Sequence, residues 1–194
     1  MIKVFTLFIF TFLSISVNPL SSQTQSNKTD AMSIDGKISV SEWAGAKVFT
    51  EFFQFIPVSD EKKYDSTIVY IKQTSEAIYI GFDYFPKGKI IAKSLTRDRS
   101  TEDENEFFVM LDLENKYQNG YFFGFSFLNN QRDAIVYNQR NQSSEWDWIW
   151  EVQSTIISEA KNGKPGHIQT EMKIPVAKMQ NKNKKQLSLK NNRK

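Results

Sequence analysis

Apolar and polar residues alternate with a period of two along most of the chain from residue 34 to residue 175. The clearest run, AIYIGFDY at 77–84, places Ile78, Ile80, Phe82 and Tyr84 on one face of an extended strand. Other runs rich in β-branched and aromatic residues also read as strands. They cover residues 67–73, 106–113, 121–128, 133–137, 146–157 and 167–174.

Turn-forming residues separate these runs at intervals of roughly 10–15 residues. Residues 74–76 read as the turn of a hairpin, and residues 115–120 and 129–131 read as further turns. Only residues 40–46 have a short helical pattern, with Ser41 in the N-cap position. Strands that follow one another through short turns favour antiparallel pairing. We therefore predict an all-β fold, an antiparallel jelly-roll-like β-sandwich.

The first residues have the pattern of an export signal. Lys3 precedes an apolar run at 4–17, and small and polar residues follow at 21–24. The run matches the apolar region of a signal peptide and is shorter than the roughly 20 residues that span a bilayer. We predict a signal peptide at 1–22, a linker at 23–33, and a mature chain without a stable membrane span. The protein would then be periplasmic, on the cell surface or extracellular; a membrane anchor is the alternative.

The charge of the chain is unevenly distributed. Residues 178–194 contain seven basic residues and no acidic one, and removing these seven and Lys3 from the 25 basic residues leaves 17 against 22 acidic ones, a net of −5. A nucleic-acid-binding domain would carry its basic residues on the folded face that meets phosphate. We therefore expect no nucleic-acid partner, and we predict a basic, disordered tail at 176–194.

The chain contains no cysteine and a single histidine, His167. Disulfides, thiolate nucleophiles and cysteine-ligated metals are therefore excluded. His167 would have to serve any Ser–His triad, and no G-x-S-x-G turn accompanies it. We expect a non-catalytic protein with no resident cofactor, apart from the calcium considered below.

Four motifs, in matching order and spacing, carry a family resemblance. They are IDGK at 34–37 followed by Glu42-Trp43, AIYIG at 77–81, the acidic-then-apolar stretch at 105–112, and TEMKIP at 170–175. Together they resemble family 9 carbohydrate-binding modules over about residues 34–175. The resemblance implies a β-sandwich with a role in carbohydrate binding. We predict Trp43 to be a core residue, because large aromatic side chains in a small domain are mostly buried.

Three further features are similar to one bacterial subgroup of these modules. They are LTRD at 95–98, Asp133, and WDWIWE at 146–151. In that subgroup the module precedes a C-terminal β-domain of unknown function. Here the sequence turns instead into the polar stretch 176–194. The resemblance therefore implies a truncated relative that lacks its β-domain partner, or a module with a disordered tail.

Sugar recognition requires flat apolar ring faces surrounded by hydrogen-bonding groups. In a strand, Trp146, Trp148 and Trp150 would point to one side, as a row of indoles suited to a glycan. We predict these three residues and Arg97 to be ligand-binding. Packing in the core is the competing interpretation, because the apolar Val152 continues the same face. An intermediate case places one indole at the rim and the others in the core.

The expected function is carbohydrate binding by aromatic stacking and polar loop contacts, with a poly- or oligosaccharide as partner. Two other classes remain open from the sequence. One is part of a glycoside hydrolase in carbohydrate catabolism, since paired carboxylates can act as acid and base. The other is an interaction module without sugar affinity.

Acidic residues cluster between residues 98 and 112. Hard oxygen ligands of this kind suit calcium, and related modules bind structural calcium. We predict Asp98, Glu104, Glu106 and Asp112 to be candidate calcium ligands. A solvated acidic loop is the alternative, because the spacing is not that of an EF-hand.

Overall fold

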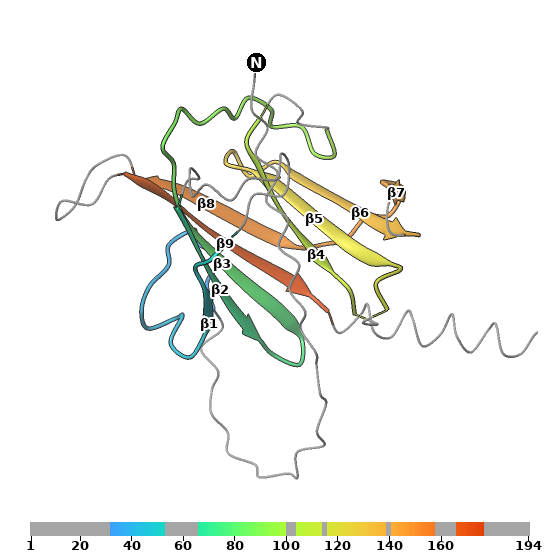
Figure 1. The fold of residues 1–194 in the computed structure, drawn as a ribbon, viewed down its shortest axis with the longest axis horizontal. Coiled ribbons are helices and arrows are strands. Elements are labelled where there is room, and N and C mark those ends of the chain that lie inside the picture. Colours follow the sequence, from blue (N-terminus) through green and yellow to red (C-terminus); the bar gives the residue numbers. More distant parts are fainter. Residues whose placement is uncertain are drawn as a thin grey trace, which may run out of the picture.

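The computed structural model describes residues 32–52, 66–99, 104–113, 116–138, 141–157 and 166–176. Within these ranges every regular element is a β-strand, and the strands form two antiparallel sheets (Figure 1). The predicted all-β sandwich is confirmed. The expected signal peptide, nearly all of the linker and all but the first residue of the basic tail lie outside the described residues.

The larger sheet has five strands in the order β1-β2-β3-β9-β8. Its strands are β1 (Lys47–Phe49), β2 (Ser66–Gln73), β3 (Ala77–Phe85), β8 (Glu151–Ile157) and β9 (His167–Pro175). The β2–β3 turn forms where it was predicted, with Thr74 N–H donating to the carbonyl of Ala77 at 2.9 Å. β9 pairs with β3 over eight residues, so the last strand of the sandwich lies inside the sheet.

The smaller sheet is a meander of four strands in the order β4-β5-β6-β7. Its strands are β4 (Glu106–Leu111), β5 (Gly120–Ser126), β6 (Gln131–Tyr137) and β7 (Asn141–Ser143). Each strand pairs with the next one along the chain. Local turns therefore account for the topology of this sheet, whereas the five-stranded sheet needs a long-range pairing.

The core lies between the two sheets and contains the face of β3 that the alternation predicted. From the five-stranded sheet it takes Ile78, Ile80, Phe82 and Tyr84 of β3 and Ile168, Met172 and Ile174 of β9. From the four-stranded sheet it takes Phe107, Val109, Leu111, Phe123, Phe125 and Phe127. The rings of Phe82 and Phe125 meet across the layers with centroids 5.5 Å apart, in the tilted geometry that aromatic pairs prefer.

The region expected to be helical, residues 40–46, forms turns instead. Trp43 N–H donates to the carbonyl of Ser39 at 3.1 Å, and the hydroxyl of Ser39, not that of Ser41, accepts from Glu42 N–H at 3.3 Å. Gly45 then adopts a φ of +75°, a conformation that ends a right-handed turn. The helical pattern is therefore too short to become a helix.

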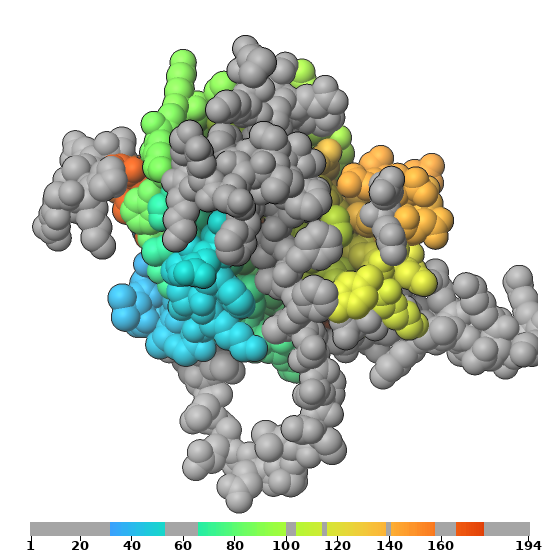
Figure 2. Space-filling model, viewed as in Figure 1, coloured from blue at the N-terminus to red at the C-terminus, as the bar shows by residue number. Residues whose placement is uncertain are grey.

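Residues 32–46 pack against the outer face of the five-stranded sheet through the contacts of Asp35 and Trp43. They are the blue part of the ribbon in Figure 1 and of the surface in Figure 2. Trp43 is buried, as predicted, but on this outer face and not between the sheets. Its ring lies over Gly81, where a Cβ atom would stand 3.0 Å from the indole. A glycine at this position of β3 is therefore what allows the indole to lie against the sheet.

Glu171 of β9 holds the N-terminal segment in place. Its Oε2 accepts hydrogen bonds from the backbone N–H groups of Asp35 and Gly36, each at 3.0 Å, and its Oε1 accepts one from Trp43 Nε1 at 2.8 Å. The side chain is fully buried, and this burial raises the pKa of its carboxyl although all three donors oppose the rise. The motifs at 34–37 and 170–175 thus meet at one carboxylate.

Among the residues described, none belongs to a helix with the length and apolar character that crossing a bilayer requires.

Candidate functional site

Residues 146–150, the tryptophan-rich segment, keep the alternation of a strand but do not pair in a sheet. The predicted strand at 146–157 begins only with β8 at Glu151. Before it, Trp148 and Trp150 point inward and are 7% and 4% exposed, whereas Ile149 between them is 85% exposed. Side chains satisfy part of the backbone here, because Asp133 accepts Trp148 N–H at 2.7 Å and Gln131 donates to the carbonyl of Trp150 at 3.0 Å.

Trp146 and Trp150 of this segment pack against aromatic rings of β5, and Trp148 stacks on Trp146. Trp146 stacks on Trp148 with centroids 5.5 Å apart and planes inclined by 9°. Its ring also lies 5.1 Å from that of Tyr121, and Trp150 meets Phe123 edge-on at 5.5 Å. The indoles therefore extend the core between the sheets.

These positions separate the three tryptophans that were expected to bind sugar. Trp148 and Trp150 have their ring faces covered by protein, so neither offers a surface on which a pyranose could stack. We therefore correct their assignment to core residues, the competing interpretation of the same pattern. Trp146 is only partly buried and lies at the rim of the core. It is the one member of the row that is not buried.

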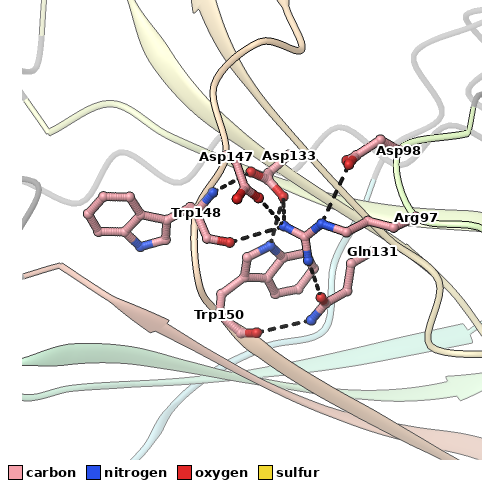
Figure 3. A network of polar contacts seen from close by, with 7 residues as sticks. All are labelled: Arg97, Asp98, Gln131, Asp133, Asp147, Trp148 and Trp150. Carbon is pink, nitrogen blue, oxygen red and sulfur yellow. Dashed lines mark hydrogen bonds and ion pairs between the residues drawn. The ribbon is translucent and has the colours of Figure 1, made fainter.

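Arg97 lies at the centre of a polar network that joins the loop after β3 to β6 and to the tryptophan-rich segment (Figure 3). Its Nη2 donates to Asp133 Oδ1 at 2.6 Å, to Asp147 Oδ1 at 2.7 Å and to the carbonyl of Trp148 at 3.1 Å. Its Nη1 donates to Gln131 at 2.6 Å, and its Nε lies 3.4 Å from Asp98 Oδ2. The Arg97 side chain is 39% exposed, so it is both a structural link and part of the surface.

Asp133 is the buried member of this network, with 1% of its side chain exposed. Besides Arg97 and Trp148 N–H, it accepts a hydrogen bond from Trp150 Nε1 at 3.3 Å. Burial raises the pKa of its carboxyl, although these donors and the charge of Arg97 work in the opposite direction. The carboxylate thus fixes the tryptophan-rich segment to β6 and orients the guanidinium at the same time.

The four predicted calcium ligands each have a different protein partner. Asp98 pairs with Arg97, Glu104 accepts from Ser94 N–H, Glu106 pairs with Arg132, and Asp112 accepts from Tyr117 N–H. Within the described ranges, no three acidic or histidine side chains are grouped closely enough to hold a metal ion. Glu102 and Asp103 of the same acidic stretch fall outside those ranges. Calcium binding by these residues stays a prediction.

His167, the single histidine, begins β9 on the outer face of the five-stranded sheet. Its Nε2 lies 3.4 Å from Asp83 Oδ1, and its ring packs 5.0 Å from that of Phe85. These neighbours are an acid and an aromatic ring. Nothing in this arrangement resembles a charge-relay triad.

Sequence reasoning missed several members of the site. Gln131 and Tyr121 gave no signal, since a glutamine at a strand end and a tyrosine in an apolar run are ordinary. Asp133 did give one, because a lone acid within the short apolar run 133–137 must find partners if it is buried. Its partners, however, come from other parts of the chain, and no local sequence pattern identifies them.

Comparisons with protein families, curated proteins and solved structures found no match to this chain.

Proposed function

We propose that this protein is an exported, non-catalytic carbohydrate-binding module that holds a glycan at Trp146. The observation that carries the proposal is the position of that ring. Trp146 is partly buried at the rim of the core and contacts the rings of Trp148, Tyr121 and Phe123. A ring fixed by its neighbours loses little conformational freedom when a sugar stacks on it.

Polar groups next to Trp146 supply the second requirement for sugar binding. The carboxylate of Asp147 follows Trp146 in the chain and is 76% exposed. Arg97 and Asp98 extend the polar surface beyond it, both about 40% exposed at their side chains. The guanidinium holds Asp147 in position, so we assign to Arg97 the positioning of this surface as well as a contact with the sugar.

The resemblance of the motifs at 34–37, 77–81, 105–112 and 170–175 to family 9 carbohydrate-binding modules agrees with this proposal. It is also the basis for proposing export and for treating a C-terminal β-domain as the partner of the module. Three of these motifs meet physically, because Glu171 binds the first and Trp43 covers Gly81 of the second. These contacts support the architecture that the resemblance implies, and the sugar affinity is left to experiment.

Isothermal titration with a panel of soluble oligosaccharides, followed by Trp146→Ala, tests the proposal. Loss of one stacked ring should weaken binding by about fivefold or more, given about 1–3 kcal/mol for a lost aromatic contact. Ile149→Ala is the matched control, since Ile149 lies on the same segment, is 85% exposed and should leave the affinity unchanged. Equal affinities of the two variants would overturn the assignment of Trp146.

Two further results would favour the rival functions. Steady release of new reducing ends from any glycan of the panel would show an enzyme, contrary to the proposal. A folded protein that binds no member of the panel would favour an interaction module without sugar affinity. Folding is checked in each case by the near-ultraviolet circular dichroism of the packed indoles.

A further inference from the structure

The inner face of the four-stranded sheet continues beyond the core. Cross-strand partners share a face, and Tyr121 of β5 pairs with Ile135 of β6, which pairs in turn with Ser143 of β7. Tyr137 lies two residues after Ile135 on the same side of β6 and pairs with Asn141 of β7. This side is the inner one, because Tyr121 packs against the core. These five residues form one patch, which we call the β5–β7 patch.

The five-stranded sheet leaves the β5–β7 patch partly uncovered. Asp133, two residues before Ile135 on the same side of β6, is 1% exposed, whereas Tyr137 is 41% exposed. Ile135 and Ser143 are half-buried, and Asn141 is exposed. In Figure 1 the ends of β5, β6 and β7 at this side reach past the end of β9. Exposure of the inner face therefore increases toward the end of β6.

The β5–β7 patch is continuous with the ring of Trp146. That ring lies 5.1 Å from the ring of Tyr121. Tyr137 lies one strand across from Tyr121 and two residues along, which corresponds to a Cα separation of about 8 Å. This separation is larger than a single pyranose ring. Trp146 and Tyr137 would therefore contact different units of one sugar chain.

The side chains of the β5–β7 patch have the chemistry that an uncharged sugar chain requires. Tyr121 and Tyr137 provide flat apolar rings with a hydroxyl group at one end. The amide of Asn141 and the hydroxyl of Ser143 can both donate and accept hydrogen bonds, and solvent reaches both side chains. No member of the patch is charged. An ionic group placed over the patch would therefore lose water without gaining an opposite charge.

We propose that the β5–β7 patch and Trp146 together bind an extended, uncharged glycan of about three or more sugar units. This inference rests on the proposed function and adds to it the length and the charge class of the ligand. Trp146 stacks on one unit, and Tyr137 stacks on a unit further along the chain. Asn141 and Ser143 form hydrogen bonds with sugar hydroxyl groups next to Tyr137.

Isothermal titration with oligosaccharides of two to six units tests this inference. The probes are four β-1,4-linked series built from glucose, xylose, mannose and N-acetylglucosamine. In a series that the protein binds, the hexasaccharide should bind about tenfold more tightly than the disaccharide, because only the longer chain reaches Tyr137. Tyr137→Ala should weaken binding of the hexasaccharide by about fivefold and should change binding of the disaccharide by less than about twofold.

Two further variants separate the ring contact from an effect on folding. Tyr137→Phe keeps the ring, so it should retain the affinity for the hexasaccharide within about twofold. Phe49→Ala is the matched control, because Phe49 is 39% exposed on β1, at the opposite edge of the five-stranded sheet from β8. That control should leave the affinities as they are in the wild-type protein.

The outcomes distinguish this inference from the proposed function. A wild-type affinity that does not rise with chain length, or a hexasaccharide affinity that Tyr137→Ala does not change, would overturn the extended site. Weakened binding in Trp146→Ala would still support carbohydrate binding in that case. A hexagalacturonate that binds more tightly than every neutral hexasaccharide would overturn the uncharged ligand class. Binding of no oligosaccharide at all would overturn both proposals.

Discussion

Replacing Glu171 by glutamine tests whether one buried carboxylate holds the N-terminal segment on the sandwich. The carboxylate offers two acceptor oxygens to three donors, namely two backbone N–H groups at 3.0 Å and Trp43 Nε1 at 2.8 Å. Glutamine has almost the same shape but only one acceptor oxygen. Its amide nitrogen must therefore face at least one of these donors, whichever way the amide is turned.

The expected loss of stability follows from these contacts. A buried donor left without an acceptor costs about 1–3 kcal/mol, and the remaining hydrogen bonds lose the benefit of a charged acceptor. The neutral amide is cheaper to bury than a carboxylate, which offsets part of this loss. We expect Glu171→Gln to lower the free energy of unfolding by about 2 kcal/mol, or the melting temperature by about 4–8 °C for a domain of this size.

A double-mutant cycle with Trp43→Phe assigns the loss to the indole contact. Trp43→Phe removes the donor that meets the glutamine amide, so Glu171→Gln should cost about 1 kcal/mol less in that background. Urea unfolding followed by far-ultraviolet circular dichroism gives all four free energies. Glu151→Gln is the control on the neighbouring strand, where an exposed ion pair with Lys173 at 2.8 Å should contribute less than about 1 kcal/mol.

Two results would refute this reasoning. One is a Glu171→Gln variant within about 0.5 kcal/mol of the wild-type protein, the range typical of surface substitutions. The other is additivity of Glu171→Gln and Trp43→Phe within about 0.3 kcal/mol, which would mean that the two side chains do not act through a shared hydrogen bond.

Three further predictions concern stability. Gly81→Ala should lower the free energy of unfolding in urea by about 1–3 kcal/mol, because the new Cβ would stand 3.0 Å from the rigid Trp43 ring. The same loss measured in a Trp43→Ala background would contradict this cause. Asp133→Asn should lower the free energy of unfolding by about 2 kcal/mol, since the single amide oxygen cannot accept from Arg97, Trp148 and Trp150 together. It should also change the near-ultraviolet circular dichroism of the indoles, and an unchanged spectrum would contradict the reasoning. Burial raises the pKa of Glu171 above its ordinary value of 4.5, so the folded state binds a proton there more readily than the unfolded chain. Ionisation of Glu171 therefore costs stability at pH values above the raised pKa. This cost disappears as the pH falls toward 4.5. The difference in unfolding free energy between wild type and Glu171→Gln should therefore grow as pH is lowered through that window, and a difference that shrinks would reverse the assigned sign.

The local pattern predicted the strands and their buried faces well. The turn at 74–76 followed from its turn-forming residues, and the inward face of β3 followed from alternation, because a period of two is a property of a few neighbouring residues. Both missed strands, β1 and β7, are three residues long and lie at sheet edges, where few side chains are buried. A short edge strand therefore leaves no alternating pattern of buried residues in the sequence.

The candidate site was predicted less completely than the fold. Alternation correctly placed Trp146, Trp148 and Trp150 on one side of the chain, but it does not say whether that side meets solvent or protein. Arg97 was selected from the sequence as a sugar contact, and two of its carboxylate partners, Asp133 and Asp147, come from other segments of the chain. Such partners become neighbours only when the sheets pack.

The sequence by itself thus determined an all-β chain with defined inner faces and turns. Only the tertiary structure decided that β9 enters between β3 and β8, that Glu171 is buried beneath residues 34–43, and that Trp146 alone of its row reaches the surface. The physical reason is that backbone alternation depends on adjacent residues, whereas the burial of a side chain depends on residues more than a hundred positions away, as between Glu171 and Gly36.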